Sequence, residues 1–191
     1  MTSGAIQDAF VIALVERGYE RVSMREIASV AGVGLGTLYL YFPNKDSIAA
    51  VTINSWVRRH ARAMEAAMNE SGASTLLERS DAMVRACVET TFSQPDQWRA
   101  LMFLERRLTP PAVYQEGYMH HVNVVSEAFA SASDWPAHRD PHTFAFTAFS
   151  LSEAALRNAL LVPDVPAPTE PFIVGIQHAV RGYLDYAVKL D

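Results

Sequence analysis

The stretch Ser23–Tyr41, SMREIASVAGVGLGTLYLY, has the residue spacing that decides the fold. Two short helices joined by a sharp turn need a small residue where they touch, a glycine at the turn, and an apolar residue that docks the second helix. Ala28, Gly32 and Leu38 follow at steps of four and six residues and supply these features in order. The stretch therefore predicts a helix-turn-helix.

Capping signals place the helices on either side of this turn. Ser23-x-x-Glu26 is a capping box that begins the first helix of the pair. The second helix is expected over about Leu35–Tyr41. An amphipathic helix precedes the pair and ends at Gly18, a typical left-handed cap. A long fourth helix is expected to follow from Asn44 to about Asn69.

Prolines and a further capping box divide the rest of the chain into five more helices. Apolar residues recur at helical spacing throughout, and no run alternates with the period of a strand. The fold class is therefore predicted to be all-α with nine helices. The last five helices are expected from Thr75 to about Thr91, from Pro95 through Phe103, and over about 110–131, 141–162 and 170–189. Pro163-x-x-Pro166-x-Pro168 is expected to be a stiff linker before the last of them.

Length and composition bound the class of protein. The chain has 191 residues, of which 19% are charged, below the roughly 25% of an average globular chain. Its longest uninterrupted apolar run, Ala9–Val15, is far shorter than the roughly 20 residues of a membrane span. The single cysteine, Cys87, cannot form an internal disulfide, which fits a reducing compartment. We expect a soluble cytoplasmic protein with no membrane partner.

Charge is distributed unevenly along the chain. Residues 1–60 hold six basic and five acidic side chains, whereas the whole chain holds 16 basic and 21 acidic ones. The remainder therefore holds ten basic and 16 acidic side chains. An overall negative charge does not exclude a nucleic-acid partner that meets only the N-terminal segment. It excludes a broad basic surface, so affinity for DNA would have to come from a compact one.

The N-terminal residues resemble the TetR family of bacterial transcriptional regulators. The resemblance covers about residues 5–52, and beyond them only the number and lengths of the helices agree. It implies an all-helical homodimer with a DNA-binding domain over 1–45 and a ligand-binding and dimerisation domain over 46–191. The matching runs are Glu16-Arg17-Gly18-Tyr19, Ser23-Met24-Arg25-Glu26-Ile27-Ala28, Ala31-Gly32-Val33, Gly36-Thr37-Leu38-Tyr39 and Tyr41-Phe42-Pro43-Asn44-Lys45.

The resemblance also assigns candidate contacts to operator DNA, which is expected to be palindromic. Arg25 is the candidate for a bidentate contact to guanine, and Leu35 for a contact to a thymine methyl group. Hydroxyl groups and a lysine near a helix N-terminus suit phosphate oxygens. The alternative is that these side chains are ordinary packing and surface residues. The full set is Ser23 and Arg25 on the supporting helix, Leu35, Gly36 and Thr37 at the tip of the recognition helix, and Tyr39, Tyr41 and Lys45 at phosphate-contacting positions.

A second group of residues is expected to line an effector pocket in the C-terminal part. Thioether, indole and phenol groups fall on inward helix stripes, with His60 and His121 as polar groups among them. Such a pocket favours a small, mostly apolar or aromatic effector, neutral or cationic. The alternative for each residue is a plain place in the core. The candidates are Trp56, His60, Met64, Met83, Cys87, Trp98, Met102, Tyr114, Tyr118 and His121.

Small residues on the last two helices are expected to form a dimer interface. Glycine inside a helix costs about 1 kcal/mol relative to alanine, so two glycines on one face indicate a close approach to another helix. The same stripes could instead pack tightly within one chain. The candidates are Ala148, Ser152, Ala155 and Ala159 on one helix, and Gly175, Ala179 and Gly182 on the next.

No residue pattern in the chain supports catalysis, a metal site or a cofactor. His138 and His142 have the spacing of helical metal ligands, but Pro141 begins a helix between them, so they need not share a face. Cys87 lies on an apolar stripe, which favours a buried thiol over a nucleophile. The resemblance, with no pattern for catalysis beside it, implies a ligand-responsive repressor that is not an enzyme. The alternative is a helical small-molecule-binding protein of the same fold that has lost operator binding.

Overall fold

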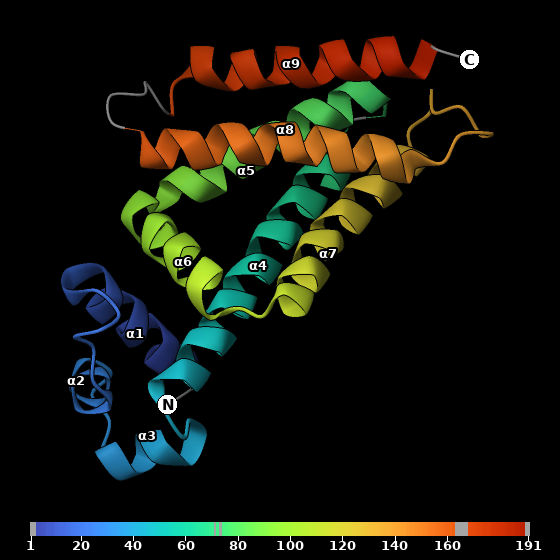
Figure 1. Cartoon of the computed structure of the whole chain (residues 1–191). Helices are drawn as coiled ribbons and strands as arrows, with labels where there is room; N and C mark the ends of the chain where they lie inside the picture. Colours follow the sequence, from blue (N-terminus) through green and yellow to red (C-terminus); the bar gives the residue numbers. More distant parts are fainter. Residues whose placement is uncertain (1–2, 71, 73, 163–167, 190–191) are drawn as a thin grey trace. The chain divides into compact units, whose positions relative to one another are not determined.

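The computed structural model describes residues 3–70, 72, 74–162 and 168–189, and this part of the chain forms nine α-helices and no strand (Figure 1). The predicted all-α class is confirmed. Pro163 and Pro166 of the expected linker lie outside the described residues. The helices are α1 (Ser3–Arg17), α2 (Met24–Val30), α3 (Leu35–Tyr41), α4 (Lys45–Glu70), α5 (Leu76–Ser93), α6 (Pro95–Leu108), α7 (Pro111–Ala130), α8 (Pro141–Leu161) and α9 (Glu170–Lys189).

The chain divides into two compact units. The N-terminal unit comprises residues 1–57 and 94–114, and the C-terminal unit comprises residues 58–93 and 115–191. Helix α4 contributes to both, and α6 belongs with the first three helices although it follows them by more than fifty positions. The predicted division by function, at residue 45, stays a prediction.

The turns of the helix-turn-helix are built as their residues require. Gly18 and Gly32 have φ angles of +72° and +66°, a left-handed conformation that favours glycine. At the start of α2 the hydroxyl of Ser23 accepts a hydrogen bond from the amide of Glu26 at 3.3 Å. Helix α3 begins at Gly34, which has no side chain to cap it. The predicted helix-turn-helix is confirmed.

The N-terminal unit has its own apolar core, and α6 completes it. Phe10, Ile27 and Leu38 are fully buried at its centre. Leu101 and Leu104 of α6 are buried in the same cluster. The N-terminal unit, called the head below, therefore consists of α1, α2, α3 and α6 together with the first part of α4.

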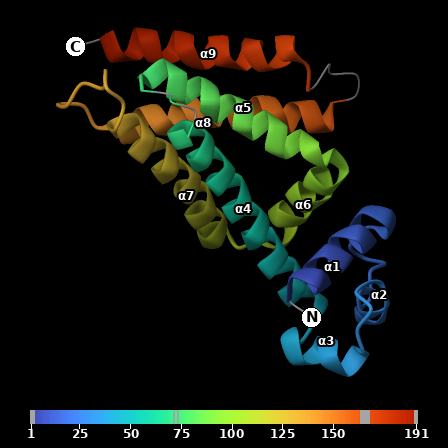
Figure 2. The same cartoon turned by 180° about the vertical axis from the view of Figure 1, so that it is seen from behind.

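The C-terminal unit packs α5, α8 and α9 side by side, as both views of the ribbon show (Figure 2). Its core includes Met64, Met83, Phe129 and Phe149, each at most 2% exposed. Polar contacts then fix α9 to α5. Arg85 donates two hydrogen bonds to Glu170, at 3.1 and 2.6 Å, and Arg181 pairs with Asp81.

None of the helices in the described ranges combines the length and the apolar character that a membrane span requires.

Candidate nucleic-acid interface and buried histidine pair

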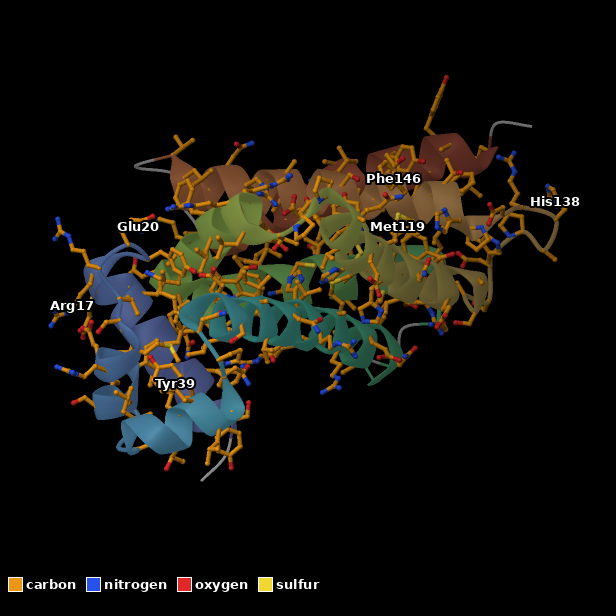
Figure 3. All side chains as sticks on the ribbon, turned by 60° about the horizontal axis from the view of Figure 1, so that its bottom comes forward. Arg17, Glu20, Tyr39, Met119, His138 and Phe146 are labelled. Atoms are coloured by element: carbon orange, nitrogen blue, oxygen red, sulfur yellow. The ribbon has the colours of Figure 1, made fainter. Side chains whose placement is uncertain are left out.

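Helix α3 exposes one face of mostly uncharged side chains. Leu38 is fully buried and anchors the helix, while Tyr39, Leu40 and Tyr41 are 50%, 85% and 51% exposed. Thr37 is exposed at its first turn. Tyr39 is labelled on this helix in Figure 3. Phenol, hydroxyl and aliphatic groups on one short helix suit contacts to phosphates and to base edges in a major groove.

The other predicted DNA contacts differ in their surroundings. Arg25 on α2 and Gly36 on α3 are exposed. Ser23 uses its hydroxyl to cap α2. Leu35 is half-buried and packs against the core of its own unit. Only part of the Leu35 side chain is therefore exposed for the predicted contact with a thymine methyl group.

Lys45 has partners inside the protein. Its ammonium group donates hydrogen bonds to the carbonyl oxygens of Tyr19 at 2.8 Å and Val22 at 3.2 Å. It also lies 4.3 Å from the centre of the Tyr19 ring. The predicted contact of this lysine with phosphate stays a prediction, and in the free protein these contacts occupy its ammonium group.

Leu40 is the exposed residue that the sequence reasoning missed. A leucine normally signals core, and the run Leu38-Tyr39-Leu40-Tyr41 does not show which leucine is buried. Residues two positions apart lie about 200° apart around a helix, so burial of Leu38 places Leu40 on the opposite side. That geometry, read from Leu38 outward, could have identified it.

The predicted pocket residues fall into both units. Trp56, Trp98, Met102 and Tyr114 belong to the N-terminal unit, and the other six belong to the C-terminal unit. In the first group the rings of Trp56 and Trp98 meet edge to face at 5.0 Å. The hydroxyl of Tyr114 accepts a hydrogen bond from Arg106 at 2.8 Å.

Two histidines meet in the interior of the C-terminal unit. Nδ1 of His60 on α4 lies 3.2 Å from Nε2 of His121 on α7, and Nδ1 of His121 lies 3.0 Å from the carbonyl oxygen of Gly117. A carbonyl only accepts, so Nδ1 of His121 carries a proton. In a neutral pair, Nε2 of His121 then accepts from Nδ1 of His60. Phe149 stacks on the His121 ring at 5.1 Å.

Burial controls the protonation of this region. Burial and, to a smaller extent, the neighbouring His121 together lower the pKa of His60 to about 3, while the backbone of Cys87 opposes the shift. His60 is therefore neutral at pH 7. Burial and the neighbouring Glu153 together raise the pKa of the Cys87 thiol to about 12. Cys87 is a protonated core residue, so it lacks the reactivity of a thiolate.

Met64 and Met83 are fully buried in the apolar core of the same unit, and Tyr118 is half-buried. The hydroxyls of Tyr118 and Ser150 lie 2.6 Å apart, and the Tyr118 ring meets Phe149 edge to face. The structure thus brings together a polar and aromatic cluster from α4, α7 and α8. Within the described residues, no three His, Cys, Asp or Glu side chains gather as metal ligands would.

The predicted dimer residues separate into an exposed set and a buried set. Gly175, Ala179 and Gly182 are exposed on α9, and a Cβ atom at either glycine would meet nothing within 4 Å. Ala148 and Ser152 are fully buried inside the chain. These two were wrongly assigned to the dimer surface, because both are covered by the packing of the chain's own core. Ala155 and Ala159 are half-buried.

The N-terminal segment matches a known family. Residues 8–51 match the family of "bacterial regulatory proteins, tetR family". A 43-residue segment is 49% identical to the fatty acid metabolism regulator protein of Bacillus subtilis (strain 168). That segment spans 22% of this chain and 22% of the relative.

Solved structures share the whole fold. The fatty acid degradation regulator FadR from Bacillus halodurans has a TM-score of 0.76 at 20% identity, covering 93% of both chains. FadR from Bacillus subtilis, in complex with stearoyl-CoA, has a TM-score of 0.72 at 19% identity, covering 98% of both. SmeT, the repressor of a multidrug efflux pump of Stenotrophomonas maltophilia, has a TM-score of 0.72 at 18% identity, covering 95% of this chain and 89% of SmeT.

The fold and the exposed α3 define the class, an all-helical protein with an N-terminal helix-turn-helix. The sequence match to the tetR family of bacterial regulatory proteins covers this helix-turn-helix segment, and the solved structures extend the likeness to the fold of the whole chain.

Proposed function

We propose that this protein is a dimeric, ligand-responsive transcriptional regulator that represses genes by binding a palindromic operator. The observation that carries the proposal is α3, a short helix anchored by the buried Leu38 that presents Tyr39, Leu40 and Tyr41 to solvent. A recognition helix needs this combination of a fixed backbone and an exposed outer face to enter the major groove.

The mechanism we propose is a population shift. Two heads in a dimer bind an operator only when the distance between their recognition helices matches the half-site spacing. An effector that binds better to a conformation with another spacing lowers the fraction of protein able to bind DNA. The effector acts only through its difference in affinity for the two conformations.

The effector we propose is small and mostly apolar. His60 is neutral at pH 7, and the core of the same unit contains Met64, Met83 and Phe149, so this region offers mostly apolar surface and no charge from His60. Sulfur-containing side chains repack easily, which suits several ligands of similar size. The fatty acid regulators with this fold support an apolar chain, and the stearoyl-CoA of one of them adds a charged alternative to test.

Fluorescence anisotropy tests DNA binding. The purified protein selects fragments from genomic DNA, and the selected duplexes are compared with scrambled ones over a range of salt concentrations. We expect selected duplexes to bind at least 10³-fold more tightly, as specific complexes do. Equal, weak binding to both would favour the alternative, a small-molecule-binding protein without an operator.

A thermal-shift panel tests the effector class. It compares aromatic compounds, lipophilic cations, a free fatty acid, stearoyl-CoA and polycarboxylate metabolites. A ligand at 100 times its dissociation constant adds about 2.7 kcal/mol of apparent stability, which raises the melting temperature measurably. If only highly charged anions stabilise the protein and release it from DNA, an apolar effector is the wrong proposal.

A further inference from the structure

The residues that join α1 to α2 form a turn whose carbonyl groups need partners from elsewhere. The turn begins at Gly18, in the left-handed conformation, and the amide of Arg21 donates back to the carbonyl of Gly18 at 3.2 Å. Tyr19 and Val22 lie between the helices, so their carbonyls are not part of a helical hydrogen-bond ladder. Ser23, the next residue, caps α2.

The first two residues of α4 hold this turn. The ammonium group of Lys45 donates to both Tyr19 O and Val22 O. The hydroxyl of Tyr19 donates to the carboxylate of Asp46. Burial and this hydrogen bond raise the pKa of Tyr19, so its hydroxyl keeps the proton that it donates. The ammonium group of Lys45 also lies over the face of the Tyr19 ring. Lys45 and Asp46, which are adjacent in the chain, therefore contact the ring and the hydroxyl of Tyr19 respectively.

A second cation reaches the turn from α6. The guanidinium of Arg107 lies 5.7 Å from the centre of the Tyr19 ring and pairs with Glu20. Arg107 and Glu20 are both more than half exposed, and exposed pairs contribute little. Lys45 is half-buried and contacts main-chain oxygens, so it is the stronger constraint on the turn.

We propose that Lys45 is a positioning residue that locks the turn between α1 and α2 to the start of α4, and so fixes the angle at which α2 and α3 meet DNA. In the free protein, the ammonium group of Lys45 contacts two carbonyl oxygens and the face of the Tyr19 ring. This role rests on the proposed function, but it exists in the free protein and is measurable there.

The test compares Lys45→Met with the wild type. Methionine keeps a flexible chain of similar length and removes the ammonium group. In the free full-length protein, amide hydrogen exchange over residues 18–23 should become faster. Lys189→Met is the control, because it removes the same charge from an exposed site on α9. It should leave that exchange unchanged.

The second measurement is DNA affinity as a function of salt, with a short duplex that the wild type selects from a random-sequence pool. We expect Lys45→Met to weaken binding roughly tenfold at every salt concentration, with the wild-type slope. A slope reduced by about 0.9 together with unchanged amide exchange would show a phosphate contact and overturn the proposal. Unchanged exchange alone also overturns it. If the wild type binds no duplex, the proposed function fails, and the exchange result still decides the role of Lys45.

Discussion

Leu38 and Leu40 lie on opposite sides of α3, the first fully buried in the core of the N-terminal unit and the second 85% exposed. An exposed leucine on the helix that we propose enters the major groove is available for apolar contact with thymine methyl groups or sugars. Substitutions at these two positions therefore test two quantities separately, the stability of the head at Leu38 and its affinity for DNA at Leu40.

Leu40→Ala should weaken binding to the selected operator by about 1–2 kcal/mol, because an apolar side chain loses its burial against DNA. Its effect on the free energy of unfolding should stay within about 0.5 kcal/mol. Anisotropy and chemical denaturation measure the two quantities. Leu38→Ala is the control and should cost about 2–5 kcal/mol of stability. Unchanged DNA affinity in Leu40→Ala would show that this side chain does not reach the duplex.

Arg25→Ala should cost about 1–3 kcal/mol of binding energy and relax preference at one base position, because a bidentate contact to guanine is lost. Affinities for duplexes with each single base change measure this. The stability of the protein should change little, since Arg25 is exposed. A uniform loss across all duplexes would assign Arg25 to phosphate.

His60→Gln should make the protein less sensitive to acid. The pKa of His60 is lowered from 6.5 to about 3 in the folded state, so the unfolded chain binds a proton in this window that the folded chain does not. The contribution of neutral His60 to the free energy of unfolding is therefore fully present above about pH 6.5, and it is lost as the pH falls toward 3. Glutamine keeps a donor for His121 but does not titrate.

Denaturation curves between pH 7 and pH 4.5 measure this effect. The wild type should lose on the order of 1–3 kcal/mol more than His60→Gln over that range. His138→Gln, at an exposed site, is the control and should follow the wild type. Parallel curves for wild type and His60→Gln would mean that this ring does not control acid stability.

Gly182→Leu should weaken the proposed dimer while leaving the single chain stable. The glycine is exposed on α9 with open space around it, and leucine favours helix by about 1 kcal/mol more than glycine. At a close contact between two chains, the added side chain costs typically 1–3 kcal/mol. Sedimentation should show more monomer at micromolar concentration. Gln115→Leu on α7 is the control. A monomeric wild type would contradict the proposed dimer, and an unchanged dimer in Gly182→Leu would place the interface elsewhere.

Local chemistry made much of the fold readable from the sequence. Gly18, Gly32 and Ser23 act through the backbone of their own turn, so their roles follow from residue type and spacing. Helix boundaries were predictable because prolines and capping boxes act within a few residues. The inward stripe of α5 was predictable as well, since Met83 and Cys87 lie one helical turn apart on an apolar face.

Pairing between distant segments could not be read in this way. The sequence indicated His60 and His121 as separate inward residues, and only the packing of α4 against α7 brings Nδ1 of His60 to 3.2 Å from Nε2 of His121. Ala148 and Gly182 both looked like dimer residues. Which of the two stripes is covered depends on the neighbouring helices, and burial within the chain excludes Ala148.

The sequence by itself determined the helix-turn-helix, the helical class and the family resemblance, because caps, glycine turns and apolar spacing act over a few residues. The tertiary structure decided the rest. It placed α6 in the N-terminal unit and Leu40 on the exposed side of α3. It also brought the ammonium group of Lys45 within hydrogen-bonding distance of two carbonyl oxygens in a turn more than twenty residues earlier in the chain. Such contacts depend on how whole helices pack, and a pattern of residue types does not specify which side chain meets which backbone group across that distance.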